Sequence, residues 1–177
     1  RVPYTISARD QMNPAALSNI DNAISEFNSQ LASVIQFVPA TASDVNLAAI
    51  DLDPSDLSGV CESNVGMTGG PQPLGGSINC TVGTLLHEMG HAVGLWHEQS
   101  RTDRNNFVNF LYSNVDKPQA SNFDQLTFNQ ADSGLYNYAS IMHYPAFEFS
   151  RDGISPTLES LPAGIPLGTL LPQYSTG

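Results

Sequence analysis

The chain has 177 residues, and 17 acidic side chains against 6 basic ones give it a formal net charge of −11. This length fits one domain, which we expect to be built as two lobes around a cleft. No apolar run approaches the roughly 20 residues that a membrane-spanning helix needs. One lysine and five scattered arginines form no basic cluster for phosphate or anionic lipid. Composition therefore excludes a membrane span and argues against nucleic acid as a partner.

The first half of the chain alternates strand and helix signals. Residues 3–7 predict a short strand, and Asn13-Pro14 predicts the N-cap and first position of a helix. Apolar side chains then recur at steps of three and four along one helical face: Leu17, Ile20, Ile24, Phe27 and Leu31. Strands are predicted over 34–38 and 45–52. The glycine- and proline-rich segment 59–76 is predicted to be irregular, with a short strand over 77–80.

A second helix is predicted over 82–93, and Gly94 follows where a helix commonly ends in a left-handed residue. Beyond Arg101 the chain is rich in aromatic residues and asparagine, with few periodic stretches. We therefore interpret the N-terminal half of the chain as α/β and the C-terminal half as largely irregular, within one domain.

Three histidines have the spacing of a metal site. His87 and His91 are four residues apart, so their imidazoles project from one face of the predicted helix. Gly94 can turn the chain so that His97 returns toward the same ion. Three neutral nitrogens leave one position of a tetrahedral Zn²⁺ ion for water, which is the arrangement of a catalytic site.

Glu88 directly follows the first histidine and is placed to take a proton from that water. Two other interpretations exist: buried core histidines, or a zinc site that only stabilises the fold. Core histidines have no reason to adopt this spacing, and structural zinc sites usually have four protein ligands and thiolates. Cys61 and Cys80 do not flank the histidines. Their number alone leaves a disulfide or two free thiols open.

The motif His87–Glu98 resembles the signature H-E-x-x-H-x-x-G-x-x-H-E of the astacin family of metzincin zinc endopeptidases. Further segments resemble the same family. Residues 101–108 are similar to its R-x-D-R-D-x-Y-V stretch, residues 121–124 match S-N-F-D, and residues 140–144 are identical to its Met-turn, S-I-M-H-Y. The resemblance implies an α+β, metzincin-like two-lobed protease fold and one catalytic Zn²⁺. The N-terminal lobe, about 1–94, would hold a mixed sheet and two helices, and the C-terminal lobe, about 95–177, would be mostly irregular. The two lobes would form a single domain, 1–177.

The resemblance also implies a role for each matching residue. The zinc ligands would be His87, His91 and His97. Glu88 would be the general base and later the proton shuttle, and Met142 would form a hydrophobic base under the metal. Tyr144 would be a displaceable fifth ligand that moves to stabilise the oxyanion of the tetrahedral intermediate. His143 is expected to be structural.

The family's short-loop disulfide matches Cys61 and Cys80, which implies a bridge and a secreted, extracellular protein. The implied partners are protein or peptide substrates and a removed pro-segment that acts as an inhibitor, and the protein is expected to be a monomer. Ile35 stands where the family usually has a cysteine of a second bridge. Glu98 is expected to bind the N-terminal amine, as in mature relatives, or to form a local salt bridge. A C-terminal helix is expected to be missing.

The segment 167–170 stands where many relatives that favour an acidic residue after the scissile bond carry a basic side chain. We expect Leu170 to line an apolar pocket and the enzyme to prefer apolar or small P1′ residues. Arg151 is the pocket candidate that would instead favour an acidic residue. Two alternatives to a protease are a catalytically silent zinc-containing binding module and a zinc amidase acting on cell-wall peptide, against which the Met-turn argues.

Overall fold

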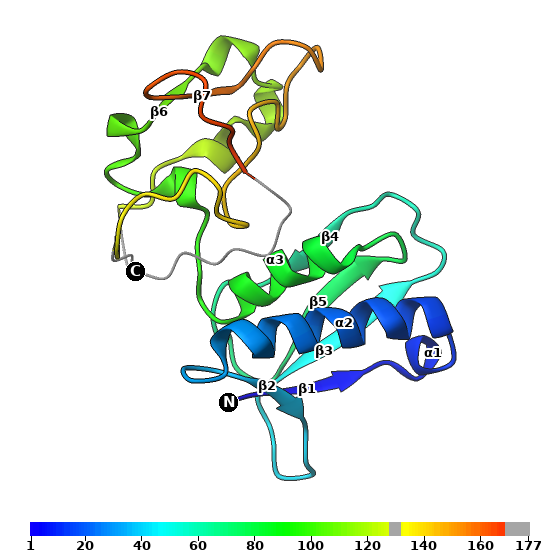
Figure 1. The fold of residues 1–177 in the computed structure, drawn as a ribbon. Helices are drawn as coiled ribbons and strands as arrows, with labels where there is room; N and C mark the ends of the chain where they lie inside the picture. The colour runs from blue at the N-terminus through cyan, green and yellow to red at the C-terminus, as the bar shows by residue number, and fades with distance from the viewer. Residues whose placement is uncertain (128–131, 169–177) are drawn as a thin grey trace. The chain divides into compact units, whose positions relative to one another are not determined.

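The computed structural model describes residues 1–127 and 132–168, and the chain divides into two compact units, Arg1–Leu95 and Trp96–Gly177 (Figure 1). The first unit contains a five-stranded sheet of order β2-β1-β3-β5-β4. Strands β1, β2, β3 and β5 are parallel, and the edge strand β4 is antiparallel to β5. The strands are β1 (Val2–Ile6), β2 (Phe37–Pro39), β3 (Leu47–Asp53), β4 (Cys61–Ser63) and β5 (Pro71–Ser77).

Two long helices, α2 (Pro14–Leu31) and α3 (Val82–Ala92), lie side by side and cover one face of this sheet (Figure 1). The predicted start of α2 is confirmed, because the Asn13 side chain accepts hydrogen bonds from the N–H groups of Ala15 and Ala16. The core between helices and sheet consists of buried side chains from both layers: Ile20, Phe27, Phe37, Ile50, Leu52, Leu74, Leu85, Leu86 and Met89. Burial of these apolar surfaces holds the helices in place on the sheet.

The four-residue helix α1 (Ala8–Gln11) is absent from the sequence prediction. Its anchor is Asp10, which is 1% exposed and accepts a hydrogen bond of 2.9 Å from the main-chain N–H of Leu52 in β3. Ser7 caps the helix by accepting from the N–H of Asp10. A helix this short has no apolar periodicity, so a pattern of hydrophobic residues does not reveal it.

The prediction for residues 59–80 was wrong in two respects. The glycine- and proline-rich segment contains β4 and most of β5, whereas 78–80 form no strand. Strand β4 pairs with residues 74–76 of β5, so the prolines at 71 and 73 lie outside the stretch that β4 covers. At Gly75 and Gly76 the neighbouring backbone is so close that an added Cβ would meet Asp51 O at 2.4 Å and Val60 O at 2.8 Å. The glycines therefore permit close strand approach.

The second unit has little regular structure, in line with the sequence. Its described residues include short 3-10 turns, the antiparallel pair of β6 (Val108–Phe110) with β7 (Leu158–Ser160), and an isolated antiparallel bridge between Val115 and Ser150. The turns are η1 (Glu98–Ser100), η2 (Arg104–Asn106), η3 (Tyr112–Asn114) and η4 (Lys117–Phe123). Its core is the aromatic and aliphatic cluster of Val108, Val115, Phe123, Tyr136, Leu158 and Leu167. The α+β fold class and the mixed sheet are thus confirmed.

In the described part of the chain, none of the helices has the length and apolar character that a bilayer crossing requires.

Candidate metal centre

Helix α3 is fixed at its N-terminus and along its buried face, which makes it a rigid support. Thr81 accepts a hydrogen bond from the Thr84 N–H, and the Thr84 hydroxyl accepts one of 2.7 Å from the Thr81 N–H, forming a capping box. The helix packs inward through Leu85, Leu86 and Met89, each 1% exposed. Side chains one turn apart on this helix therefore have a defined separation.

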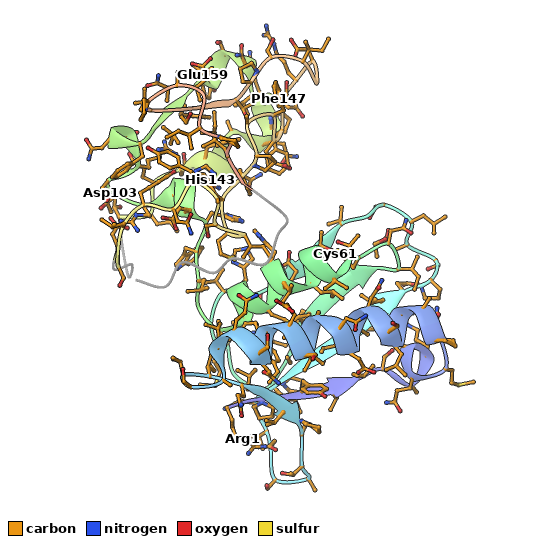
Figure 2. The ribbon with its side chains drawn as sticks, viewed as in Figure 1. Arg1, Cys61, Asp103, His143, Phe147 and Glu159 are labelled. Carbon is orange, nitrogen blue, oxygen red and sulfur yellow. A yellow bond between two sulfur atoms is a disulfide. The ribbon has the colours of Figure 1, made fainter. Side chains whose placement is uncertain are left out.

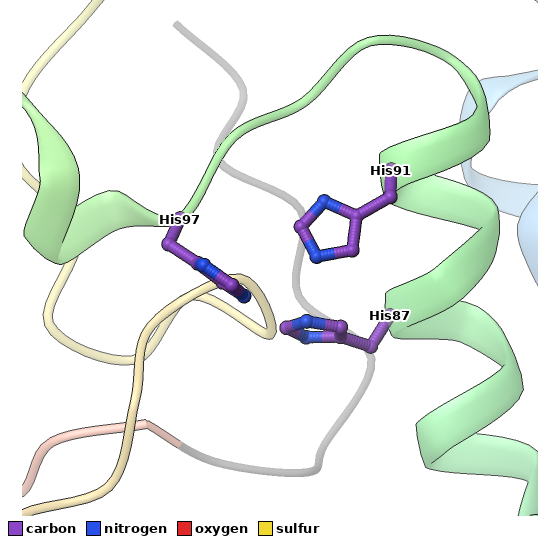
Figure 3. A group of neighbouring side chains, drawn as sticks. All are labelled: His87, His91 and His97. Atoms are coloured by element: carbon purple, nitrogen blue, oxygen red, sulfur yellow. The ribbon is translucent and has the colours of Figure 1, made fainter. Parts of the chain in front are cut away.

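His87 and His91 project from adjacent turns of α3, with ring centroids 4.7 Å apart. His97 follows the helix, and Figure 3 shows the three imidazoles pointing toward one another. One ligand atom from each of the three histidines lies within 4.8 Å of the others. The structure thus brings together the three residues that the sequence singled out, and neutral imidazoles are donors that Zn²⁺ prefers.

The turn after α3 depends on Gly94, which has φ +100° and therefore adopts a conformation that side chains rarely tolerate. Its N–H donates to the His91 carbonyl at 2.8 Å, and the Leu95 N–H donates to the Gly90 carbonyl at 3.0 Å. These two bonds close the helix end and reverse the chain direction. His97 lies three residues after Gly94, so the turn directs it toward His87 and His91.

One ring nitrogen of His91, Nδ1, is held by a main-chain carbonyl. Nδ1 lies 2.8 Å from the Leu95 carbonyl, which can only accept, so Nδ1 carries the proton. This leaves Nε2 as the nitrogen that would face a metal. Burial, with the nearby charge of His87, lowers the pKa of His91 to about 4, so its ring is neutral near pH 7, as a metal ligand must be.

Glu88 is 7% exposed, and its surroundings raise its pKa to about 8. Burial is the main cause of the raised pKa, and the charge of Glu62 in β4 is the second. A hydrogen bond from the Ser63 N–H lowers the pKa and so partly offsets them. Edge strand β4 thus supplies both the charge of Glu62 and the N–H of Ser63 that act on this carboxylate. Sequence reasoning missed this contribution, because β4 lies in the segment predicted to be irregular.

His97 and the Met-turn are tied together within the second unit. The His97 ring lies 4.4 Å from the Tyr144 ring, centroid to centroid, at an interplanar angle of 51°. The Glu98 N–H donates to the Met142 carbonyl at 2.9 Å, and Met142 is 3% exposed. The segment that carries the third histidine is therefore held against the turn that carries Tyr144.

Glu98 forms the local salt bridge that the sequence offered as one of two possibilities. Its Oε1 lies 3.4 Å from Arg101 Nη1 and accepts a hydrogen bond of 2.9 Å from the Asn137 N–H. Burial raises the pKa of Glu98, partly offset by these two partners. Arg1 makes a separate ion pair with Asp44, at 2.8 Å.

The described geometry agrees with the comparison to known families. The family model for astacin, peptidase family M12A, matches residues 1–165. The chain belongs to the astacin family. It is 37% identical over 171 residues to zinc metalloproteinase nas-13 of Caenorhabditis elegans, covering 95% of this chain and 36% of that protein. It is 41% identical over 116 residues to astacin-like metalloprotease toxin 1 of Loxosceles intermedia, covering 63% of this chain and 44% of that protein.

Among solved structures, the chain resembles high choriolytic enzyme 1, a hatching enzyme zinc-protease from Oryzias latipes, with a TM-score of 0.82 and 29% identity. The alignment covers 99% of this chain and 83% of that one. By contrast, the chain spans only about a third of the length of three curated relatives that it matches, from 28% to 37%.

The predicted astacin disulfide is present: Cys61 in β4 is bonded to Cys80, just before α3, with 5.9 Å between the Cα atoms (Figure 2). Leu170, the predicted pocket residue, lies outside the described residues. Arg151 is exposed, and its main-chain N–H donates to the Asn114 carbonyl.

Sequence reasoning missed two buried polar residues beside the Met-turn, Gln99 and Arg104. Gln99 Oε1 accepts a hydrogen bond of 2.9 Å from the Tyr144 N–H, and Arg104 Nη1 donates to the Gln99 carbonyl at 3.1 Å. Both residues lie in or next to stretches that resemble the family. Only their place in these stretches could have indicated a role for the two residues, because no sequence pattern shows which main-chain groups a buried side chain will contact.

Proposed function

We propose that the chain is the catalytic domain of a secreted zinc endopeptidase that hydrolyses peptide bonds in proteins. The observation that carries the proposal is the convergence of three imidazole nitrogens with a buried glutamate next to the first of them. His87, His91 and His97 would hold one Zn²⁺ ion. Three neutral nitrogen donors fit that ion, and they leave a coordination position open.

When bound, zinc would lower the pKa of a water molecule and polarise the carbonyl of the scissile peptide. Glu88 would take a proton from the attacking water and return it to the departing amine. Its position one residue after a ligand, with its carboxylate in a mostly buried site, supports this role.

Tyr144 would be a fifth, displaceable ligand through its phenol oxygen. On substrate binding, its hydroxyl would donate a hydrogen bond to the oxyanion of the tetrahedral intermediate. Support comes from the tilted contact between its ring and that of His97 at 4.4 Å. Met142, which is buried in the same turn, would serve as a structural base, and Gly94 and Glu98 would hold the segment of the third ligand.

We further propose a preference for apolar or small P1′ residues. It rests on the absence of a basic side chain in 167–170 and on the net charge of −11, which disfavours acidic substrates. Profiling on a peptide library tests it: dominant cleavage before aspartate or glutamate would show that a basic group such as Arg151 sets the specificity. The disulfide supports the proposed secretion, because such bridges persist in oxidising compartments. A pro-segment inhibitor and a monomeric state are also part of the proposal.

The decisive experiment compares Glu88→Gln with wild type for bound zinc and for casein hydrolysis. We expect zinc to be retained and proteolysis to be lost, and 1,10-phenanthroline to abolish the wild-type activity. Glu159→Gln, an exposed glutamate of β7 (Figure 2), is the matched control and should behave as wild type. Full activity of Glu88→Gln would refute the assignment. An inactive, zinc-loaded wild type would favour a silent binding module, and hydrolysis of cell-wall peptide alone would favour an amidase.

A further inference from the structure

The main chain of Tyr144 is held on both of its polar groups by side chains. Its N–H donates to Gln99 Oε1 at 2.9 Å. Its carbonyl lies 2.6 Å from His143 Nδ1, which must carry the proton because a carbonyl only accepts. The other nitrogen, Nε2, then accepts from the Tyr136 hydroxyl at 2.7 Å. Both polar main-chain groups of Tyr144 are thus held by side chains, in a segment that forms neither strand nor helix itself.

Aromatic rings and a glycine restrict the same residue. Phe123 and Phe149 each meet the Tyr144 ring edge to face, with centroids 5.6 Å apart. Phe149 has φ +52°, a left-handed conformation that costs a non-glycine residue energy and that often occurs at functional sites. A Cβ on Gly168 would lie 2.8 Å from the carbonyl carbon of Tyr144. The backbone of Tyr144 is therefore closely packed against Gly168, and its ring contacts two other aromatic rings.

Gln99 is the member of this arrangement whose presence is hardest to explain by packing. Its side chain is completely buried, and among the described residues its Nε2 has no hydrogen-bond partner. A buried donor without a partner is destabilising, and an apolar side chain of the same size would avoid this cost. Glutamine is needed here for its side-chain oxygen, which accepts a hydrogen bond from the Tyr144 N–H.

A second buried residue keeps Gln99 in place. Arg104, 7% exposed, donates through Nη1 to the main-chain carbonyls of both Gln99 and Phe123. Gln99 holds the backbone of Tyr144 and Phe123 contacts its ring, so this one guanidinium joins two of the neighbours that restrict Tyr144.

We propose that Gln99 is a positioning residue for Tyr144: its side-chain carbonyl fixes the tyrosine backbone, so that the phenol swings about a stationary Cα between its two positions. This inference rests on the proposed role of Tyr144. It assigns Gln99 no contact with substrate or metal. Gln99 would affect the reaction only by positioning the Tyr144 hydroxyl. A residue that only stabilises the fold would affect it whether or not that hydroxyl is present.

The test is a double-mutant cycle between Gln99→Met and Tyr144→Phe. Methionine keeps the volume but removes the acceptor. We expect Gln99→Met to retain zinc and to lower kcat and kcat/KM together by about 10- to 100-fold with little change in KM, since the lost positioning acts only in the transition state. In the Tyr144→Phe background, the same change should have no further effect. Gln99→Glu, which keeps an oxygen acceptor, should be more active than Gln99→Met.

Asn28→Leu is the matched control, because Asn28 Oδ1 accepts the main-chain N–H of Phe37 at 2.8 Å in the first unit. Any loss it causes should be the same in both backgrounds. An equal loss for Gln99→Met in both backgrounds would overturn the inference and leave Gln99 a structural residue. If Gln99→Met does not fold, Gln99→Asn, which withdraws the acceptor by one methylene, takes its place in the cycle.

The cycle also separates this inference from the proposed function. If Tyr144→Phe lowers kcat and Gln99→Met does not, the role of Gln99 is refuted and that of Tyr144 stands. If Tyr144→Phe has wild-type kcat, the oxyanion role of Tyr144 is refuted and the inference falls with it. The role of Glu88 is judged by its own variant.

Discussion

Gly94 adopts φ +100° at the end of α3, and an added Cβ would meet nothing within 4 Å. Gly94→Ala therefore introduces no steric overlap with other residues and changes only the backbone preference at this position. The turn begins the segment that returns His97 toward His87 and His91. The substitution consequently tests whether this single dihedral angle matters for the metal site.

The energy involved is limited. Holding an L-residue in the left-handed region costs about 1 to 2 kcal/mol relative to glycine. If the turn keeps its shape, this strain lowers the free energy of unfolding by that amount, and zinc affinity is unchanged. If the turn relaxes, His97 moves and zinc affinity falls instead. The same energy then corresponds to a weakening of about 5- to 30-fold.

The assay is zinc affinity by competition with a chromophoric chelator, together with urea unfolding of the metal-free protein. Gly59→Ala is the control, since Gly59 has φ +80°, also has open space around its Cβ position, and lies outside the turn. It should lose stability by a similar amount and bind zinc as wild type. If Gly94→Ala changed neither quantity, or if Gly59→Ala weakened zinc binding equally, the argument from the turn would be refuted.

Three further variants test other parts of the structure. Cys61→Ser with Cys80→Ser opens a loop of 19 residues' separation and should reduce the free energy of unfolding by about 3 kcal/mol in urea titrations; a loss below about 1 kcal/mol would count against it. Hydrogen bonds, chiefly from the Ser155 N–H, hold the pKa of Asp152 below its usual range. The stability that this carboxylate contributes is therefore complete above the unfolded-state pKa of about 4, and it is lost as pH falls through the lower folded-state pKa. We expect Asp152→Asn to show a smaller decrease of melting temperature at acid pH than wild type. Parallel plots of melting temperature against pH for the two proteins would contradict this. Gly168→Ala places a Cβ 2.4 Å from the His143 carbonyl oxygen at φ +56° and should cost at least about 2 kcal/mol in thermal melts, whereas an equally stable protein would show that the loop can shift.

The sequence was most informative where local chemistry determines structure. Asn13 and Pro14 marked the start of α2, and the spacing of apolar residues gave its buried face. The ligand spacing on α3 and the glycine after it predicted a convergence of three histidines, and the structure brings their ligand atoms together. In each case the signal lies within about one or two helical turns, where helix geometry alone fixes which side chains are neighbours.

The failures occurred where structure depends on partners distant in sequence. Strand β5 contains two prolines and two glycines, which argue against a strand when considered alone. It forms because β3 pairs along its whole length, from Leu47 with Pro71 to Asp53 with Ser77. The burial of Glu88 beside β4, and the hydrogen bond from the Ser63 N–H, depend on the same pairing and were equally inaccessible.

The irregular second unit raises a different physical problem, because its buried main-chain groups have few strand or helix partners. Buried polar side chains satisfy several of them. Arg101 donates to the carbonyls of Ser133 and Gly134, and Glu98 accepts from the Asn137 N–H. Arg104 and Gln99 act in the same way on the segments around Tyr144.

This arrangement explains why two arginines can be buried where hydrophobic residues would otherwise be expected. Each of Arg101 and Arg104 is 7% exposed, and each joins chain segments that are far apart in sequence. A guanidinium can serve this purpose because it offers five donors in a rigid plane, whereas a lysine offers a single ammonium on a flexible stem. In this unit, side chains therefore replace the hydrogen-bond ladders of a sheet. The position of Tyr144 consequently depends on individual residues, and this is why single substitutions at Gln99 can test it.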